Sequence, residues 1–136
     1  MIKTKLINLI IIVMCAIQLY GCSHTDNIVS VAASEFEKKL KADSVILLDV
    51  RTPQEYAEGH IDGAINIDVK SDDFQLQAEK ELSKDTTVLV YCRSGRRSMD
   101  AAETLSKLGY RVVNLTGGII EWMDDGLPVS VEDGSK

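Results

Sequence analysis

Short apolar runs of strand length alternate with helix-forming segments between residues 28 and 123 of this 136-residue chain. The runs at residues 45–50 and 86–91 are rich in β-branched residues, which is typical of strands buried on both faces of a parallel sheet. Strands that alternate with helices pair in parallel through crossover connections. The sequence therefore predicts one α/β domain, with a mainly parallel sheet of four to five strands and helices on both faces.

Residues that start or stop helices mark the ends of several expected elements. Thr52 and Pro53 form a start signal for a short helix that stops at Gly59. Ser98 is the expected N-cap of a helix that stops at Gly109. Further strands are predicted at residues 28–31, 64–67 and 111–115, and further helices at residues 34–41, 72–82 and 118–123.

Cys92 lies between the strand predicted at residues 86–91 and the helix predicted to begin at Ser98. Ligands of open parallel sheets bind beyond the carboxyl ends of the strands, and helix N-termini stabilise anions through free N–H groups. A cysteine thiol in such a place, beside arginines, ionises below its usual pKa of about 8.5. Gly95 lets successive N–H groups turn inward as an anion-binding nest. We therefore predict a reactive thiolate rather than an inert buried cysteine.

The residues that follow Cys92 are candidates for binding an anionic substrate beside the sulfur. They are Arg93, Ser94, Gly95, Arg96, Arg97 and Ser98. Arg93 and Arg96 have an alternative role as ordinary solvated charges. The spacing from Cys92 to Arg97 is Cys-x4-Arg, one residue shorter than the Cys-x5-Arg loop of cysteine-dependent phosphatases. This shorter loop disfavours a phosphatase or an arsenate reductase.

Three separated motifs resemble those of the rhodanese family of sulfurtransferases. They are an Asp-Val-Arg that leads into Gly-His-Ile-x-Gly-Ala, a Cys-x-x-Gly-x-Arg-Ser loop and a C-terminal Thr-Gly-Gly, here at residues 49–64, 92–98 and 116–118. Asp62 stands where the family commonly has proline. The resemblance covers residues 28–131 and implies a rhodanese-like fold.

The resemblance also implies a function. Cys92 would accept a sulfane sulfur and carry it as a persulfide. The expected donor is thiosulfate or a similar small anion, and the expected acceptor is cyanide in an assay and a thiol or thioredoxin-like partner in the cell. A tethered, non-enzymatic carrier of sulfane sulfur and a protein-docking module are the alternatives.

Asp49 and Arg51 are supporting candidates, because both sit where a neighbouring strand ends. We favour an Asp–Arg interaction that fixes the loops around the site over a catalytic acid and a substrate clamp. His60 is expected to be a structural residue rather than a base. The chain has two histidines, which leaves no cluster of zinc ligands, and no cofactor is expected.

The charge balance restricts the class of partner. The chain has 15 basic and 21 acidic residues, with a formal net charge of −6. An acidic body disfavours nucleic acid, and the basic loop at Cys92 favours a small anion. One compact domain without a spare apolar stripe predicts a monomer.

Residues 1–21 have the pattern of a signal peptide. Lysines precede an apolar run of about 15 residues, which is shorter than a membrane-spanning helix of about 20. The run ends at Cys22 in a sequence that resembles a bacterial lipobox, so we expect Cys22 to be lipidated. Residues 22–27 would form a tether and residues 132–136 a polar tail. This predicts a lipoprotein anchored to a membrane on the periplasmic side of the cell envelope, with an uncleaved anchor or a secretory signal as alternatives.

Overall fold

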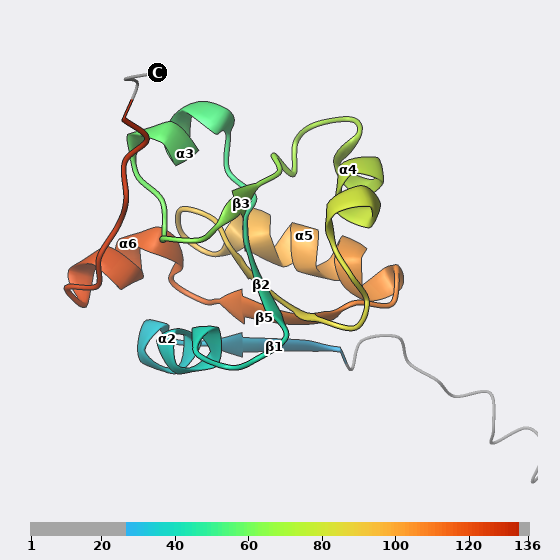
Figure 1. Ribbon diagram of the computed structural model, residues 1–136, viewed down its shortest axis with the longest axis horizontal. Helices are drawn as coiled ribbons and strands as arrows, with labels where there is room; N and C mark the ends of the chain where they lie inside the picture. The colour runs from blue at the N-terminus through green and yellow to red at the C-terminus, as the bar shows by residue number, and fades with distance from the viewer. Residues whose placement is uncertain (1–26, 134–136) are drawn as a thin grey trace, which may run out of the picture.

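Five strands form the central sheet of the computed structural model, which describes residues 27–133 (Figure 1). They are β1 (Ile28–Val31), β2 (Val45–Asp49), β3 (Ile65–Asn66), β4 (Thr87–Tyr91) and β5 (Arg111–Leu115). Their order is β1-β5-β4-β2-β3, and each neighbouring pair is parallel. The predicted parallel α/β fold is confirmed.

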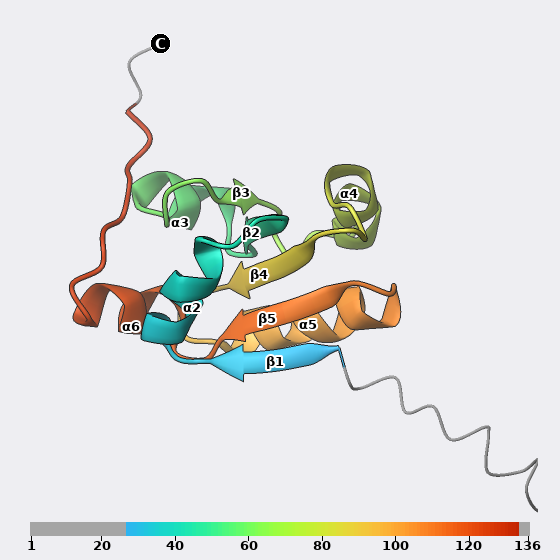
Figure 2. The same ribbon diagram turned by 60° about the horizontal axis from the view of Figure 1, so that its bottom comes forward.

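Helices cover both faces of this sheet, as Figure 2 shows for α2 and α5. The helices of the described region are α2 (Ala33–Leu40), α3 (Pro53–Glu58), α4 (Phe74–Glu81), α5 (Arg96–Lys107) and α6 (Gly118–Asp124). Helices α4 and α5 pack on one face, and α2 and α6 pack on the other. No helix within residues 27–133 is long and apolar enough to cross a bilayer.

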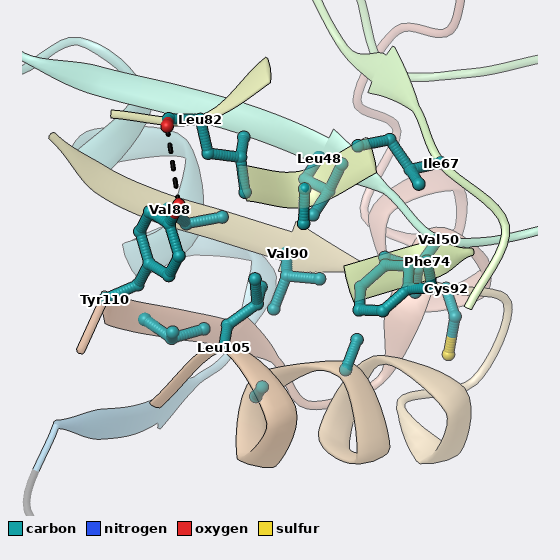
Figure 3. Packing of buried hydrophobic residues seen from close by; sticks show 14 residues of the cluster. Leu48, Val50, Ile67, Phe74, Leu82, Val88, Val90, Cys92, Leu105 and Tyr110 are labelled. Atoms are coloured by element: carbon teal, nitrogen blue, oxygen red, sulfur yellow. Dashed lines mark hydrogen bonds between the residues drawn. The ribbon is translucent and has the colours of Figure 1, made fainter. Parts of the chain in front are cut away.

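The alternation of side chains along β4 divides the core into two clusters. Val88 and Val90 join the cluster under α4 and α5, which includes Phe74, as Figure 3 shows. Leu89 and Tyr91 join the cluster under α2 and α6. Successive side chains of a strand point to opposite faces, so a strand between two helical layers is apolar throughout. The carboxyl end of β4 is thus held from both sides.

The N-cap of α5 lies three residues earlier than predicted. It is Gly95, whose φ of 98° lies in the left-handed region, and the Met99 amide donates to the Gly95 carbonyl oxygen at 3.2 Å. The N-cap assignment of Ser98 is therefore wrong. Serine is a preferred N-cap by residue type, but here glycine reaches the backbone angle that ends the loop. Ser98 lies in the first turn, where its hydroxyl donates to the Gly95 carbonyl oxygen at 3.1 Å.

The segment after α6 folds back along α3. The backbone of Ser130 pairs with that of His60, with N–O distances of 2.7 and 2.9 Å. The Trp122 indole donates to the Pro128 carbonyl oxygen at 2.9 Å, which holds the start of the segment against α6. Val129 is thereby placed between α3 and α6.

Candidate active site

Cys92 follows directly after β4 and is buried, with 1% of its surface exposed. Cys92 belongs to the same core cluster as Val50 and Phe74, and its sulfur lies at the end of that cluster in the view of Figure 3. The Cys92 carbonyl oxygen accepts from the Ile119 amide at 2.9 Å, and Sγ accepts from the Gly95 amide at 3.1 Å. The sulfur is therefore held between the end of a strand and the first turn of α5, as the sequence predicted.

Two glycines allow the loop and the N-terminus of α6 to pack backbone against backbone. A Cβ atom at Gly95 would overlap the carbonyl oxygen of Thr116, and a Cβ atom at Gly118 would overlap the carbonyl group of Arg93. Both glycines also have positive φ, of 98° and 63°. Any larger residue at either position would push the loop away from α6, so the place of Cys92 depends on both.

The loop stabilises the thiolate of Cys92. Burial by itself raises the pKa of the thiol, but hydrogen bonds from the Ser98 hydroxyl and from the amides of Ser98, Ser94 and Gly95 outweigh it, and the pKa lies below its usual value. The Ser98 hydroxyl has one hydrogen, which it gives to the Gly95 carbonyl in the neutral site. To donate to the thiolate, this hydroxyl must turn its hydrogen from the Gly95 carbonyl toward the sulfur.

Arg97 does not face the sulfur as an unpaired charge. Its Nη1 and Nη2 atoms donate to the Oε2 and Oε1 atoms of Glu55 at 2.7 and 2.8 Å. Glu55 also accepts from the amide and hydroxyl of Thr52, in the capping box that begins α3. Hydrogen bonds from Arg97 are the main reason that the pKa of Glu55 is lowered to about 2, and the carboxylate raises the pKa of Arg97 in turn.

The sequence predicted the cap at Thr52 but missed the role of Glu55 at the site. The capping-box spacing was the signal that places a carboxylate in the first turn of α3. Nothing local could show that this carboxylate meets a residue 42 positions further along the chain.

Asp49 and Arg51 form the ion pair that the sequence suggested. Arg51 Nη2 lies 2.6 Å from Asp49 Oδ2, and Nε donates to both carboxylate oxygens at 3.0 and 3.1 Å. Arg51 also donates to the Gly59 carbonyl oxygen at 2.7 Å, across the length of α3. Burial lowers the pKa of Arg51, but the bonds and charge of Asp49 outweigh it, and the net pKa is raised. The pair ties the end of β2 to the end of α3.

Arg93, Ser94 and Arg96 are exposed, unlike Arg97 and Ser98. Arg93 lines a pocket of about 260 Å³ between α3, α6 and the C-terminal segment. The lining residues are Arg51, Glu55, Glu58, Gly59, Arg93, Ile119, Ile120, Met123 and Val129. Arg96 is not among them, so the two exposed arginines of the loop face different surroundings.

The chain matches the model of the rhodanese-like domain over residues 32–125. It belongs to the rhodanese-like family. A sulfurtransferase from Allochromatium vinosum is 42% identical to this rhodanese-like domain over 93 residues, which are 68% of this chain and 84% of that protein. The thiosulfate sulfurtransferase PspE of Escherichia coli is 43% identical over 72 residues, which are 53% of this chain and 68% of that protein.

Solved structures agree with the family assignment. The crystal structure of a rhodanese-related protein from Thermoplasma volcanium has a TM-score of 0.67 and 36% identity to this rhodanese-like domain, and the match covers 76% of this chain and 98% of that one. Sulfur transfer is the activity that the family and these relatives support.

The remaining predicted residues lie away from the sulfur or outside the described region. His60 stacks on Tyr56 with ring centroids 3.8 Å apart, and its Nδ1 lies 2.8 Å from the Tyr56 carbonyl oxygen. Within residues 27–133 there is no group of three or more histidine, cysteine, aspartate or glutamate residues that could hold a metal ion. Cys22, the signal peptide at residues 1–21 and the end of the polar tail lie outside the described residues.

Proposed function

We propose that this rhodanese-like domain transfers sulfane sulfur from thiosulfate to a thiophilic acceptor through a persulfide on Cys92. The observation that carries the proposal is the hydrogen bonding of Sγ by the loop, which lowers the pKa of a buried thiol at the end of β4. A thiolate is the nucleophile that attacks a sulfane sulfur.

In the first half-reaction the Cys92 thiolate attacks the outer sulfur of thiosulfate. The S–S bond of the donor breaks, its electron pair leaves with sulfite, and a new S–S bond joins the transferred sulfur to Cys92. Sulfite leaves as a dianion, and the outer sulfur of the persulfide keeps the negative charge that it carried in thiosulfate. The loop amides that lower the pKa of the thiol are in place to stabilise this charge.

Arg93 is the arginine best placed to attract the donor. It is exposed, it follows Cys92 directly, and it lines the pocket beside the loop. Arg97 supports the loop rather than the leaving sulfite, because Glu55 occupies both of its terminal nitrogens. Arg96 is exposed at the start of α5 and adds positive potential.

In the second half-reaction an acceptor thiolate removes the outer sulfur. The persulfide S–S bond breaks, and its electron pair returns to Cys92 as the thiolate. Because one residue carries the sulfur between the two steps, the kinetics are expected to be ping-pong. Cyanide is expected to act as the acceptor in an assay.

The test is the intact mass of the full chain after incubation with thiosulfate, compared with the Cys92→Ser variant. We expect one added sulfur on the wild type alone, and its loss when cyanide is added. An aryl phosphate and arsenate, offered in parallel, should not be turned over. A wild-type protein without the sulfur adduct would overturn the proposal, and slow release to every acceptor would favour a sulfur carrier.

The proposed attachment to the cell envelope depends on residues 1–22 alone. It is tested by the distribution of the protein between membrane and soluble fractions in the native host. We expect the wild type in the membrane fraction and the Cys22→Ser variant out of it, whatever the result at Cys92.

A further inference from the structure

The strands of the sheet all run the same way, so the sheet has two distinct ends. Cys92 follows β4 at the carboxyl end, beside the N-terminus of α5. The described chain enters at the other end, which we call the amino end, because Asn27 directly precedes β1. Figure 2 shows that β1 begins on the right and that the arrowheads of β1, β4 and β5 point left. The chain therefore enters the domain at the end that lies away from Cys92.

The amino end carries an excess of positive charge in an acidic domain. Helices α2, α4 and α5 each end a few residues before a strand begins, which brings their last turns to this end. Seven of the 12 basic residues between residues 27 and 133 lie there, with four of the 20 acidic residues. The basic residues are Lys38, Lys39, Lys41, Lys80, Lys84, Lys107 and Arg111, and the acidic residues are Asp43, Glu79, Glu81 and Asp85. The amino end thus has the opposite sign to most of the surface.

The dipoles of the helices account for only part of this charge. A lysine in the last turn stabilises the negative end of a helix, as Lys80 and Lys107 do in α4 and α5. Lys84 and Arg111 lie outside the helices, both are exposed, and neither forms an ion pair within residues 27–133. A negatively charged surface at this end would give these two side chains a partner.

Part of the sheet is also uncovered at the amino end. Helix α2 has eight residues, and two adjoining hollows of about 240 and 190 Å³ lie on the sheet at this end. They share Thr87 and Val113, and each is lined by one basic residue, Arg111 in the first and Lys39 in the second. Val29 lines the first hollow and leaves 53% of its surface exposed. Apolar contact and attraction between basic side chains and anionic lipids both contribute to binding at a membrane surface.

We propose that the amino end of the sheet lies against an anionic lipid bilayer, with the loop of Cys92 turned to the aqueous side. This inference rests on the proposed attachment through Cys22. Cys22 precedes Asn27 by five residues, which span at most about 18 Å. Asn27 lines the same hollow as Val29. A lipid on Cys22 therefore keeps the amino end close to the headgroups that its basic residues bind.

The orientation determines how partners reach the site. The five residues of β4 span about 17 Å at about 3.3 Å per residue, and Cys92 follows the end of β4 that points away from the bilayer. A soluble sulfur donor or acceptor then reaches Cys92 without crossing the membrane surface. The opposite orientation would place the exposed Arg93 and Arg96 against the headgroups and cover the site.

The test maps the lysines that the bilayer shields. Protein purified from host membranes is added to preformed vesicles of phosphatidylethanolamine and phosphatidylglycerol, and its lysines are acetylated with a reagent that does not cross the bilayer. Peptide mass gives the rate at each lysine. We expect acetylation of Lys41, Lys84 and Lys107 to be about fivefold slower than on neutral phosphatidylcholine vesicles. Lys70, exposed after β3 at the carboxyl end, should react equally on both.

Salt and matched variants test the physical cause. In 1 M salt the screening length is about 3 Å, so the protection should be lost. The double variant of Lys84→Gln and Lys107→Gln should reduce the protection of the remaining lysines at the amino end, whereas Lys70→Gln should not. Val29→Asp should reduce it too, because anionic headgroups repel a carboxylate. Its control is Val131→Asp, which is 65% exposed on the C-terminal segment and should have no effect.

The outcomes separate this inference from the functions on which the protein depends. Protein that floats with the vesicles but shows equal rates on both lipids, or protection at Lys70 instead, overturns the proposed orientation alone. Protein that floats with neither vesicle overturns the attachment through Cys22, and the orientation with it. Loading of Cys92 by thiosulfate, measured on the same vesicles, tests the sulfur transfer separately. A melting temperature equal to that of the wild type shows that a variant is folded.

Discussion

Arg97 and Glu55 form a two-point ion pair that joins the loop of Cys92 to the first turn of α3. The two N–O distances are 2.7 and 2.8 Å, and the side chains leave 21% and 28% of their surface exposed. The pair crosses 42 residues of sequence. Because Arg97 is paired with Glu55, it is not available as an unpaired charge that binds the substrate.

A double-mutant cycle measures this pair. We expect the Glu55→Gln and Arg97→Gln variants to show a coupling free energy of about 1 to 2 kcal/mol in urea unfolding, because the bonds are charge-assisted and partly shielded. The control is the exposed pair of Glu35 and Lys39, 3.6 Å apart on α2, whose coupling should stay below about 0.5 kcal/mol. Equal coupling in both cycles would contradict the assigned role of Glu55.

Glu55 also predicts how stability depends on acid. Its pKa is lowered from 4.5 to about 2 in the folded protein, so the unfolded chain binds the proton more tightly. The carboxylate contributes stability that is complete above about pH 5 and is lost as the pH falls toward 2. We expect the free energy of unfolding of Glu55→Gln to fall less over this range than that of the wild type. Parallel curves would show that other carboxylates dominate.

Ser98→Ala tests the stabilisation of the Cys92 thiolate. Removal of the hydroxyl should raise the pKa of the thiol, since that hydroxyl donates to the charged form. The pH dependence of alkylation at Cys92, read by peptide mass, should shift to higher pH. Ser94→Ala keeps the amide that reaches the sulfur, so its alkylation profile should match the wild type. If the pH dependence of alkylation in Ser98→Ala equals that of the wild type, the loop amides alone lower the pKa of the Cys92 thiol.

Asp49→Asn should be strongly destabilising. It leaves the guanidinium of Arg51, which is only 5% exposed, without its compensating charge, and loss of one partner of a buried pair costs about 3 to 5 kcal/mol. Asp43→Asn, an exposed change just before β2, should stay within about 0.5 kcal/mol of the wild type. Urea unfolding of both variants checks the comparison, and similar values would show that Arg51 finds other partners.

Gly118→Ala and Gly126→Ala separate steric overlap from backbone strain. Both glycines have positive φ, of 63° and 75°, but a Cβ atom meets the Arg93 backbone only at Gly118 and open space at Gly126. Gly126→Ala should cost about 1 kcal/mol, and Gly118→Ala about 2 kcal/mol more. Gly118→Ala should also slow persulfide formation on Cys92. Equal losses in melting temperature and activity would mean that the loop tolerates the displacement.

Local sequence was sufficient to predict the strand and the helix that hold Cys92. The apolar run of β4, the helical repeat of α5 and the cysteine between them predicted a thiolate at the end of a parallel strand, and the structure places Cys92 there. Such features follow from side-chain periodicity and from the free N–H groups of helix ends, which depend on residues close in the chain. The start of α5 was predicted too late, because the left-handed angle of Gly95 and not the residue type of Ser98 ends the loop.

Only the tertiary structure decided which charges remain for a ligand. The sequence offers several arginines and carboxylates near the motifs, and it cannot say that Glu55 occupies Arg97 while Glu58 and Arg93 line one pocket without an ion-pair partner in the described region. The strength of an ion pair depends on the distance and burial of two groups. The distance and the burial of the two groups are set by the packing of the loop after β4 against the end of β2 and against α3. Neither quantity can be obtained from the spacing of residues along the chain.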